Sequence, residues 1–162
     1  YGMQMAVIEF TRNVAGIKDA NSEEVDPKSK NMVIHLMEEQ KKLLEDGKFG
    51  GTIRLGAWPC KIKEHSLLNS LYSKYNNTLF SNLPVVMERH RHRYEFNNEY
   101  RELLESKGLV ISGTSPDGLL VEAIELPKEK HPFFVATQYH PELKTRFLES
   151  HPIFLGFLNS IK

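Results

Sequence analysis

Residue types and sequence patterns that would indicate a secreted or a membrane protein are rare or absent in this chain of 162 residues. It contains a single cysteine, Cys60, and therefore cannot form an internal disulfide bond. No apolar run approaches the ~20 residues that a membrane-spanning helix requires. We therefore expect a soluble protein located in the cytoplasm.

An excess of charge of either sign is also lacking. The chain has 21 basic and 21 acidic residues and a formal net charge of +0. This balance gives no global electrostatic reason to bind a polyanion or an anionic membrane. We expect neither nucleic acid nor a membrane as a partner. The length, with 40% hydrophobic residues, is typical of one domain with a sizeable core.

The N-terminus has no initiator methionine and leads at once into a helical pattern. Four apolar side chains recur at helical spacing: Met3, Val7, Phe10 and Val14. They predict an amphipathic helix that ends near Gly16. Backbone N–H groups in the first turn of a helix are unpaired and attract negative charge, so the functional interest lies in that turn. Since the initiator methionine is missing, we expect the chain to be cut from a longer protein, and because no signal-peptide pattern is present, we expect the missing part to be another segment or domain.

The rest of the chain mixes helix and strand signals. Alternating or continuous apolar runs predict strands within 32–37, 52–56, 85–96, 109–112, 119–126 and 133–137. Caps predict helices after Ser66, after Asn97 or Asn98, and from Pro152. Turn residues at 115–118 predict a hairpin. The charged stretch 38–48 is expected to be a solvated, mobile excursion.

The strand at 133–137 leads to the clearest chemical signal. It is followed by His140, with Glu142 two positions further on. An imidazole beside a carboxylate that orients it is the pair that acyl transfer needs, and the nucleophile would come from elsewhere in the chain. A surface histidine after an edge strand gives the same pattern.

A second unusual run alternates arginine and histidine: Arg89, His90, Arg91, His92 and Arg93. On a strand, the arginines share one face and the histidines the other. The run suits a phosphate patch, a site for a carboxylate substrate, or a solvated edge strand, and the planar guanidinium of arginine favours carboxylate recognition. Because no cysteine or second cluster completes a ligand set with the two histidines, we expect no metal site.

Cys60 is a poor candidate for the nucleophile. It follows Trp58-Pro59 in a strand-like stretch, without the tight glycine turn and helix N-terminus that expose and acidify a reactive thiol. We expect a buried structural cysteine.

Five motifs together carry a family resemblance: Tyr1-Gly2-Met3-Gln4, 51–56 (Gly-Thr-Ile-Arg-Leu-Gly), 89–95 (Arg-His-Arg-His-Arg-Tyr-Glu), 121–125 (Val-Glu-Ala-Ile-Glu) and 138–142 (Gln-Tyr-His-Pro-Glu). Over essentially all 162 residues the chain resembles the C-terminal class I glutamine amidotransferase domain of the cytidine triphosphate synthase family. The resemblance implies an α/β fold with three layers and a mainly parallel central sheet. It also implies that residues 1–162 are the C-terminal part of one domain, with the N-terminal strands missing.

The resemblance also assigns the site. The nucleophile of the family is a cysteine immediately before the position of Tyr1, which makes His140 and Glu142 the other two members of a Cys-His-Glu triad. The segment Tyr1, Gly2, Met3 and Gln4 would border the glutamine pocket, and the Tyr1 N–H would be an oxyanion donor. Glu24 would accept from the substrate's amino group, and Arg93 would lie at its carboxylate end. No metal is implied.

The implied activity is hydrolysis of L-glutamine to glutamate and ammonia. The ammonia would pass to a separate synthase domain of the same polypeptide, a ligase of pyrimidine biosynthesis that converts UTP to CTP with ATP. No cofactor is expected in this domain, ATP and Mg²⁺ are expected in the synthase domain, and the full-length protein is expected to be a homotetramer. Three alternatives stay open: another amidotransferase, a γ-glutamyl hydrolase, or a catalytically inactive regulatory module.

Overall fold

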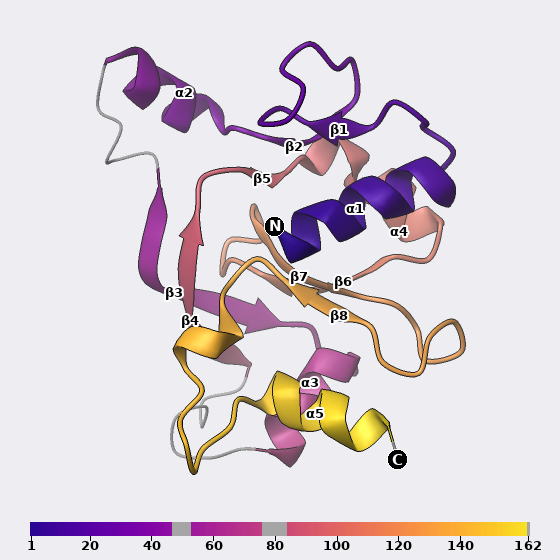
Figure 1. The fold of residues 1–162 in the computed structure, drawn as a ribbon, viewed down its shortest axis with the longest axis vertical. Coiled ribbons are helices and arrows are strands. Elements are labelled where there is room, and N and C mark those ends of the chain that lie inside the picture. Colours follow the sequence, from indigo (N-terminus) through magenta and orange to yellow (C-terminus); the bar gives the residue numbers. More distant parts are fainter. Residues whose placement is uncertain (47–52, 76–83, 162) are drawn as a thin grey trace.

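The computed structural model describes residues 1–46, 53–75 and 84–161 (Figure 1). Its helices are α1 (Gly2–Asn13), α2 (Glu38–Glu45), α3 (Leu67–Lys74), α4 (Arg101–Ser106) and α5 (Pro152–Ser160), with 3₁₀ turns η2 (Asn98–Tyr100) and η3 (Pro141–Leu143). Its strands are β1 (Asn21–Ser22), β2 (Met32–His35), β3 (Arg54–Ile62), β4 (Val85–His92), β5 (Glu95–Phe96), β6 (Val110–Thr114), β7 (Val121–Glu125) and β8 (Val135–Thr137). No helix in these described ranges is long and apolar enough to span a bilayer.

The strands form two sheets that are mainly antiparallel, so the prediction of a mainly parallel sheet is wrong for the described residues. The larger sheet has the order β4-β3-β6-β7-β8, and each neighbouring pair in it is antiparallel. The smaller sheet has the order β1-β2-β5, in which only β1 and β2 are parallel. Short connections at 115–120 and 126–134 join β6 to β7 and β7 to β8, and such connections cannot make the crossover that parallel strands need.

Helices cover both faces of the larger sheet. In Figure 1, α1 lies on one side of β7 and β8, and α3 and α5 lie together on the other. One apolar core joins α1 to β2, β6 and β7, including Met3, Val7, Ile34 and Ile124. A second core joins α3 and α5 to β3, β4 and β7, including Cys60, Leu68, Tyr72, Ala123 and Ile153. The sheet is therefore a middle layer between helices, and the carboxyl end of β8 lies at the start of α1.

Helix α1 confirms the N-terminal prediction. Met3 and Val7 are buried, and Phe10 packs against the same core. Val14, however, lies just beyond the last turn and is exposed, because the helix ends one residue before it. The helix therefore buries three of the four predicted side chains and leaves its first turn beside β8.

The prediction of a solvated, mobile excursion at 38–48 missed a helix at residues 38–45. These residues form α2, because glutamate, glutamine, lysine and leucine are all good helix formers. Residues 47 and 48 lie outside the described residues. The density of charge in this segment was therefore a poorer guide than its helix propensity.

The predicted caps and the hairpin are confirmed. Ser66 Oγ accepts from Asn69 N at 2.9 Å, and Asn97 Oδ1 accepts from Glu99 N at 3.0 Å. In the turn between β6 and β7, Gly118 donates to the Ser115 carbonyl at 2.8 Å with φ of 79°, a left-handed conformation that favours glycine.

Candidate functional site

The predicted imidazole and carboxylate form a close pair. His140 Nδ1 donates to Glu142 Oε1 at 2.7 Å. Burial alone would raise the pKa of Glu142, but the hydrogen bond from His140, a backbone hydrogen bond and the nearby imidazoles together outweigh it, and the pKa lies below its ordinary value. Glu142 therefore stays a carboxylate and fixes the proton of His140 on Nδ1. That tautomer leaves Nε2 as the nitrogen that can accept or deliver a proton.

Backbone hydrogen bonds fix the place of His140 itself. Its N–H donates to the carbonyl of Arg89 on β4 at 2.8 Å, and its carbonyl accepts from Leu143 N at 3.0 Å. Pro141 begins η3 directly after it, so the chain turns sharply and carries Glu142 back toward the ring. The imidazole is thus held between the end of β8 and the neighbouring strand β4.

A cavity of about 440 Å³ opens beside His140 and collects most of the other predicted residues. Its walls include Tyr1, Gln4, Glu24, Arg93 and His140. These residues come from α1, the turn after β1, the end of β4 and the end of β8. A cavity of this size is typical of small-molecule sites.

Tyr1 and Glu24 form one side of this cavity. The Tyr1 hydroxyl donates to Glu24 Oε1 at 2.7 Å, and this hydrogen bond is the main reason that the pKa of the phenol is raised. The adjacent Glu23 turns away and accepts from Leu36 N at 2.7 Å. Of the two neighbouring carboxylates, only that of Glu24 therefore faces the cavity.

Arg93 brings a positive charge to the wall of the same cavity. It follows the last residue of β4 and is half-buried. Within the described part of the chain, its buried Nε has no hydrogen-bond partner. A guanidinium with an unused donor beside a cavity suits a ligand carboxylate.

A second cavity, of about 430 Å³, shares Tyr1 and His140 with the first. Gly2, Met3 and Glu142 line it, so all eight predicted site residues border one cavity or the other. Met3 also belongs to the apolar core, and its contribution here is mainly packing.

Sequence reasoning missed Gln138, two residues before His140. Its side chain is buried, and Nε2 donates to the Tyr94 carbonyl at 2.8 Å. Gln4 Nε2 donates to the same carbonyl at 3.2 Å. The two amides hold the backbone that follows Arg93. In the sequence, Gln138 stood out only as the polar residue after an apolar run and as the first residue of the motif at 138–142.

Cys60 is buried and structural, as predicted. It is 0% exposed on β3, and burial is the main reason that the pKa of its thiol lies well above the ordinary value. A thiol in this state has little thiolate and no path to substrate. It is not among the residues that line the two cavities beside His140.

The histidines of the alternating run lie over a buried group of charges. As predicted, Arg89 and Arg91 are exposed on one face of β4, while His90 is buried on the other. Burial, with the nearby Arg54 guanidinium, lowers the pKa of His90 to about 2 and that of His92 to about 3. Both rings are therefore neutral near pH 7, and His90 Nδ1 lies 2.8 Å from His92 Nε2.

Glu122, on β7, brings a third possible metal ligand to His90 and His92, which the sequence did not suggest. Ligand atoms of the three residues lie within 4.8 Å of one another. However, Arg54 Nη2 is 2.9 Å from Glu122 Oε1, and the same guanidinium is 3.4 Å from Glu95. This partly buried cation already lies against both carboxylates, so a metal ion would meet its repulsion.

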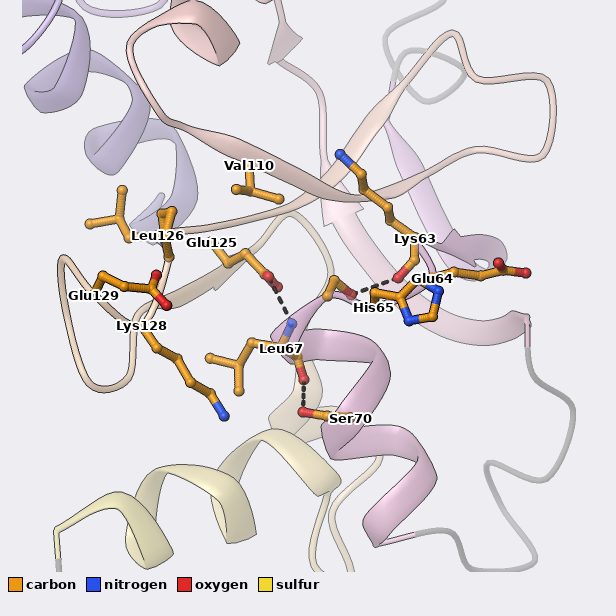
Figure 2. A pocket seen from close by; sticks show the side chains of 12 residues that line it. Lys63, Glu64, His65, Leu67, Ser70, Val110, Glu125, Leu126, Lys128 and Glu129 are labelled. Carbon is orange, nitrogen blue, oxygen red and sulfur yellow. Dashed lines mark hydrogen bonds between the residues drawn. The ribbon is translucent and has the colours of Figure 1, made fainter.

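Another cavity, of about 510 Å³, lies at the N-terminus of α3, and His140 is not among its lining residues (Figure 2). The carboxylate of Glu125 points at the start of the helix, where it accepts from Leu67 N at 2.7 Å and Leu68 N at 3.0 Å. The unpaired N–H groups of the helix end are thus satisfied from within the protein. Glu125 has a structural role.

Known proteins match this chain over nearly its whole length. A family model described as glutamine amidotransferase class-I matches residues 1–160. The chain is 58% identical over 160 residues to a CTP synthase of Caldanaerobacter subterraneus subsp. tengcongensis, and 52% identical over 161 residues to one of Chlorobium phaeobacteroides. Each alignment covers 99% of this chain.

A solved structure described as the glutaminase domain of Trypanosoma brucei CTPS with bound acivicin has a TM-score of 0.82 and 37% identity. The match covers 98% of this chain and 56% of that one. The chain spans only 27% and 26% of the length of the two bacterial CTP synthases. The match over nearly the whole chain nevertheless shows the family: this chain belongs to the class I glutamine amidotransferases.

Proposed function

We propose that this chain is the glutaminase part of a CTP synthase and takes part in the hydrolysis of L-glutamine to glutamate and ammonia. The observation that carries the proposal is the convergence of a hydrogen-bonded His140–Glu142 pair, a carboxylate and an arginine on neighbouring cavities. The identity to CTP synthases over almost the whole chain supports the same conclusion.

Glutamine would bind as a zwitterion in the cavity beside His140. Glu24 would accept from its ammonium group, with the Tyr1 hydroxyl holding the carboxylate in place. Arg93, which lines the cavity, would donate to the α-carboxylate. The carboxamide would then extend toward His140.

The nucleophile would be a cysteine that precedes Tyr1 in the full-length protein. Tyr1 and His140 line both cavities, so a residue joined to Tyr1 would lie beside the imidazole. Its thiolate would attack the carboxamide carbon, and backbone N–H groups, including that of Tyr1, would hold the oxyanion. His140 would protonate the departing ammonia. It would then deprotonate the water that hydrolyses the thioester to glutamate and regenerates the thiolate.

In the full-length protein, the ammonia would pass to a synthase domain of the same polypeptide. That domain would use ATP and Mg²⁺ to convert UTP to CTP, within a homotetramer. Residues 1–162 would be the C-terminal part of the amidotransferase domain, and further strands of a three-layer fold would lie before Tyr1.

The experiment compares glutamine-dependent and ammonia-dependent CTP formation by the full-length protein and its His140→Ala variant. We expect the variant to lose glutamine-dependent turnover by several orders of magnitude and to keep the ammonia-dependent reaction, because added ammonia bypasses this site. Glutamine-dependent CTP formation that is unchanged in His140→Ala would refute the assigned role, and an absence of both activities in the wild type would refute the function.

A further inference from the structure

The segment that carries the catalytic pair is attached to β4 at three successive residues. The Arg89 carbonyl accepts from His140 N at 2.8 Å, and the Met87 carbonyl accepts from Lys144 Nζ. Between them, the side chain of Glu88 points into the protein and is 0% exposed. Residues 139–151, from the end of β8 to the start of α5, therefore lie over one buried carboxylate.

Glu88 is linked to both ends of this segment, at one end indirectly through Tyr72 of α3 and at the other directly to His151. At one end, the Tyr72 hydroxyl of α3 donates to Glu88 Oε1 at 2.9 Å and lies 3.2 Å from the Tyr139 hydroxyl. Since the proton of Tyr72 is used on Glu88, Tyr139 must donate to Tyr72. Burial is the main reason that the pKa of each phenol lies well above its ordinary value, so both remain donors. The residue next to His140 is thus tied to Glu88 through Tyr72.

At the other end, His151 makes a second tie. His151 is the N-cap of α5, and its Nδ1 accepts from Ile153 N at 3.3 Å. Because a ring nitrogen that accepts carries no proton, the ring proton is on Nε2. Nε2 lies 3.2 Å from Glu88 Oε1 and donates to it. Lys144, in the middle of the segment, places its ammonium 3.7 Å from the same oxygen.

These interactions meet at one carboxylate oxygen, Glu88 Oε1. Glu88 itself does not line either cavity beside His140. A buried carboxylate that is removed leaves its donors unpaired, which costs more than the bonds themselves contribute. The hydrogen-bond donors here belong to Tyr72 and His151, and the ammonium of Lys144 would lose an ion-pair partner. Their relaxation would shift the backbone on either side of His140, while Glu24, after β1, and Arg93, five residues beyond Glu88 at the end of β4, lie outside residues 139–151.

We propose that Glu88 is a positioning residue for the glutaminase reaction, holding residues 139–151 on β4 so that His140 meets the reacting atoms. The inference rests on the proposed function. Because proton transfer and attack depend steeply on geometry, the loss of this anchor lowers kcat. KM changes little, because the groups expected to bind the zwitterion stay in place.

The test measures glutaminase kcat and KM of the full-length protein with Glu88→Met, a substitution of similar length without an acceptor. We expect kcat to fall by about 10- to 100-fold and KM to stay within about threefold. Glu88→Gln keeps one carbonyl acceptor and should recover part of kcat. His151→Asn keeps a capping side chain but removes the donor to Glu88, so it should reproduce the fall in kcat even if Glu88→Met does not fold.

Glu125→Met is the matched control. Glu125 is also a buried carboxylate that accepts hydrogen bonds from α3, but its partners are Leu67 N and Leu68 N, away from residues 139–151. Both substitutions should lower the thermal midpoint, and only that at Glu88 should lower kcat. With an active wild type, unchanged kcat in Glu88→Met and His151→Asn, or an equal loss of kcat in Glu125→Met, would overturn the inference alone. A full-length wild type without glutaminase activity would overturn the proposed function instead, and this inference with it.

Discussion

Replacement of Arg93 with alanine should separate the use of glutamine from the use of ammonia. Arg93 borders the cavity beside His140 and carries a buried Nε that has no partner in the described residues. The proposed partner is the α-carboxylate of glutamine. The substitution would leave that carboxylate facing an apolar methyl group in a partly closed cavity.

The size of the effect follows from the burial of Arg93. Removal of one member of a desolvated charge pair costs on the order of 2–5 kcal/mol, and the half-buried position of Arg93 places it toward the lower end of that range. A loss of about 2–3 kcal/mol lowers glutamine-dependent kcat/KM by about 30- to 150-fold. Arg93→Lys keeps the charge but not the planar fork, so it should restore only part of the loss.

The assay follows CTP formation by the full-length protein with each nitrogen source. Ammonia needs no carboxylate-binding group, so ammonia-dependent turnover should survive in Arg93→Ala. Arg89→Ala is a matched control, because Arg89 is an exposed arginine of the same run, and it is not among the residues that line the cavity. It should leave kcat/KM for glutamine within about twofold.

Two outcomes would refute this reasoning. Equal losses with glutamine and ammonia in Arg93→Ala would mean that Arg93 supports the fold or a domain contact instead of the substrate. A loss in Arg89→Ala as large as that in Arg93→Ala would mean that the positive charge of the whole run matters, and not the cavity.

Three further predictions test other parts of the account. Glu142→Ala should lower glutaminase kcat less than His140→Ala does. The double variant should have a kcat only slightly below that of His140→Ala, because the two residues act together. Additive losses of kcat would indicate separate roles. Cys60→Ser should leave the glutaminase turnover of the full-length protein nearly unchanged, and a loss of several orders of magnitude would make Cys60 the nucleophile. Burial raises the pKa of Glu95 to about 7 against the partial opposition of Arg54, so folding favours its protonated form. The stability that protonated Glu95 contributes is therefore present below about pH 4.5 and is lost as the pH rises through about 7. Relative to Glu95→Gln, the wild type should lose up to about 3 kcal/mol of unfolding free energy over that interval. Parallel pH profiles of the two proteins in chemical denaturation would contradict this.

The catalytic pair could be predicted because its chemistry is local. His140 and Glu142 are two residues apart after an apolar strand, and one hydrogen bond of 2.7 Å joins them in the structure. Glu24 and Arg93 could be assigned only through family resemblance, since nothing in their spacing shows that they border one cavity. Their meeting depends on how α1, β1 and β4 come together.

The buried charges were beyond sequence reasoning for the same reason. Arg54, Glu95 and Glu122 lie on three different strands, and each looks like an ordinary surface charge in the sequence. The mainly parallel sheet was implied by the resemblance, and the sheets of the described residues are instead mainly antiparallel; an apolar run predicts a buried strand but not the direction of its neighbours. The hairpin turn at 115–118 was the local signal that pointed to antiparallel pairing.

The central claim, that a cysteine joined to Tyr1 attacks glutamine with the help of His140, can be tested by trapping the intermediate. The full-length protein would be mixed with glutamine, quenched in acid during turnover, digested and mapped by mass spectrometry. The account predicts a γ-glutamyl thioester on the cysteine immediately before Tyr1. A γ-glutamyl group on Cys60, or a residue other than cysteine before Tyr1 in a protein that still hydrolyses glutamine, would contradict it.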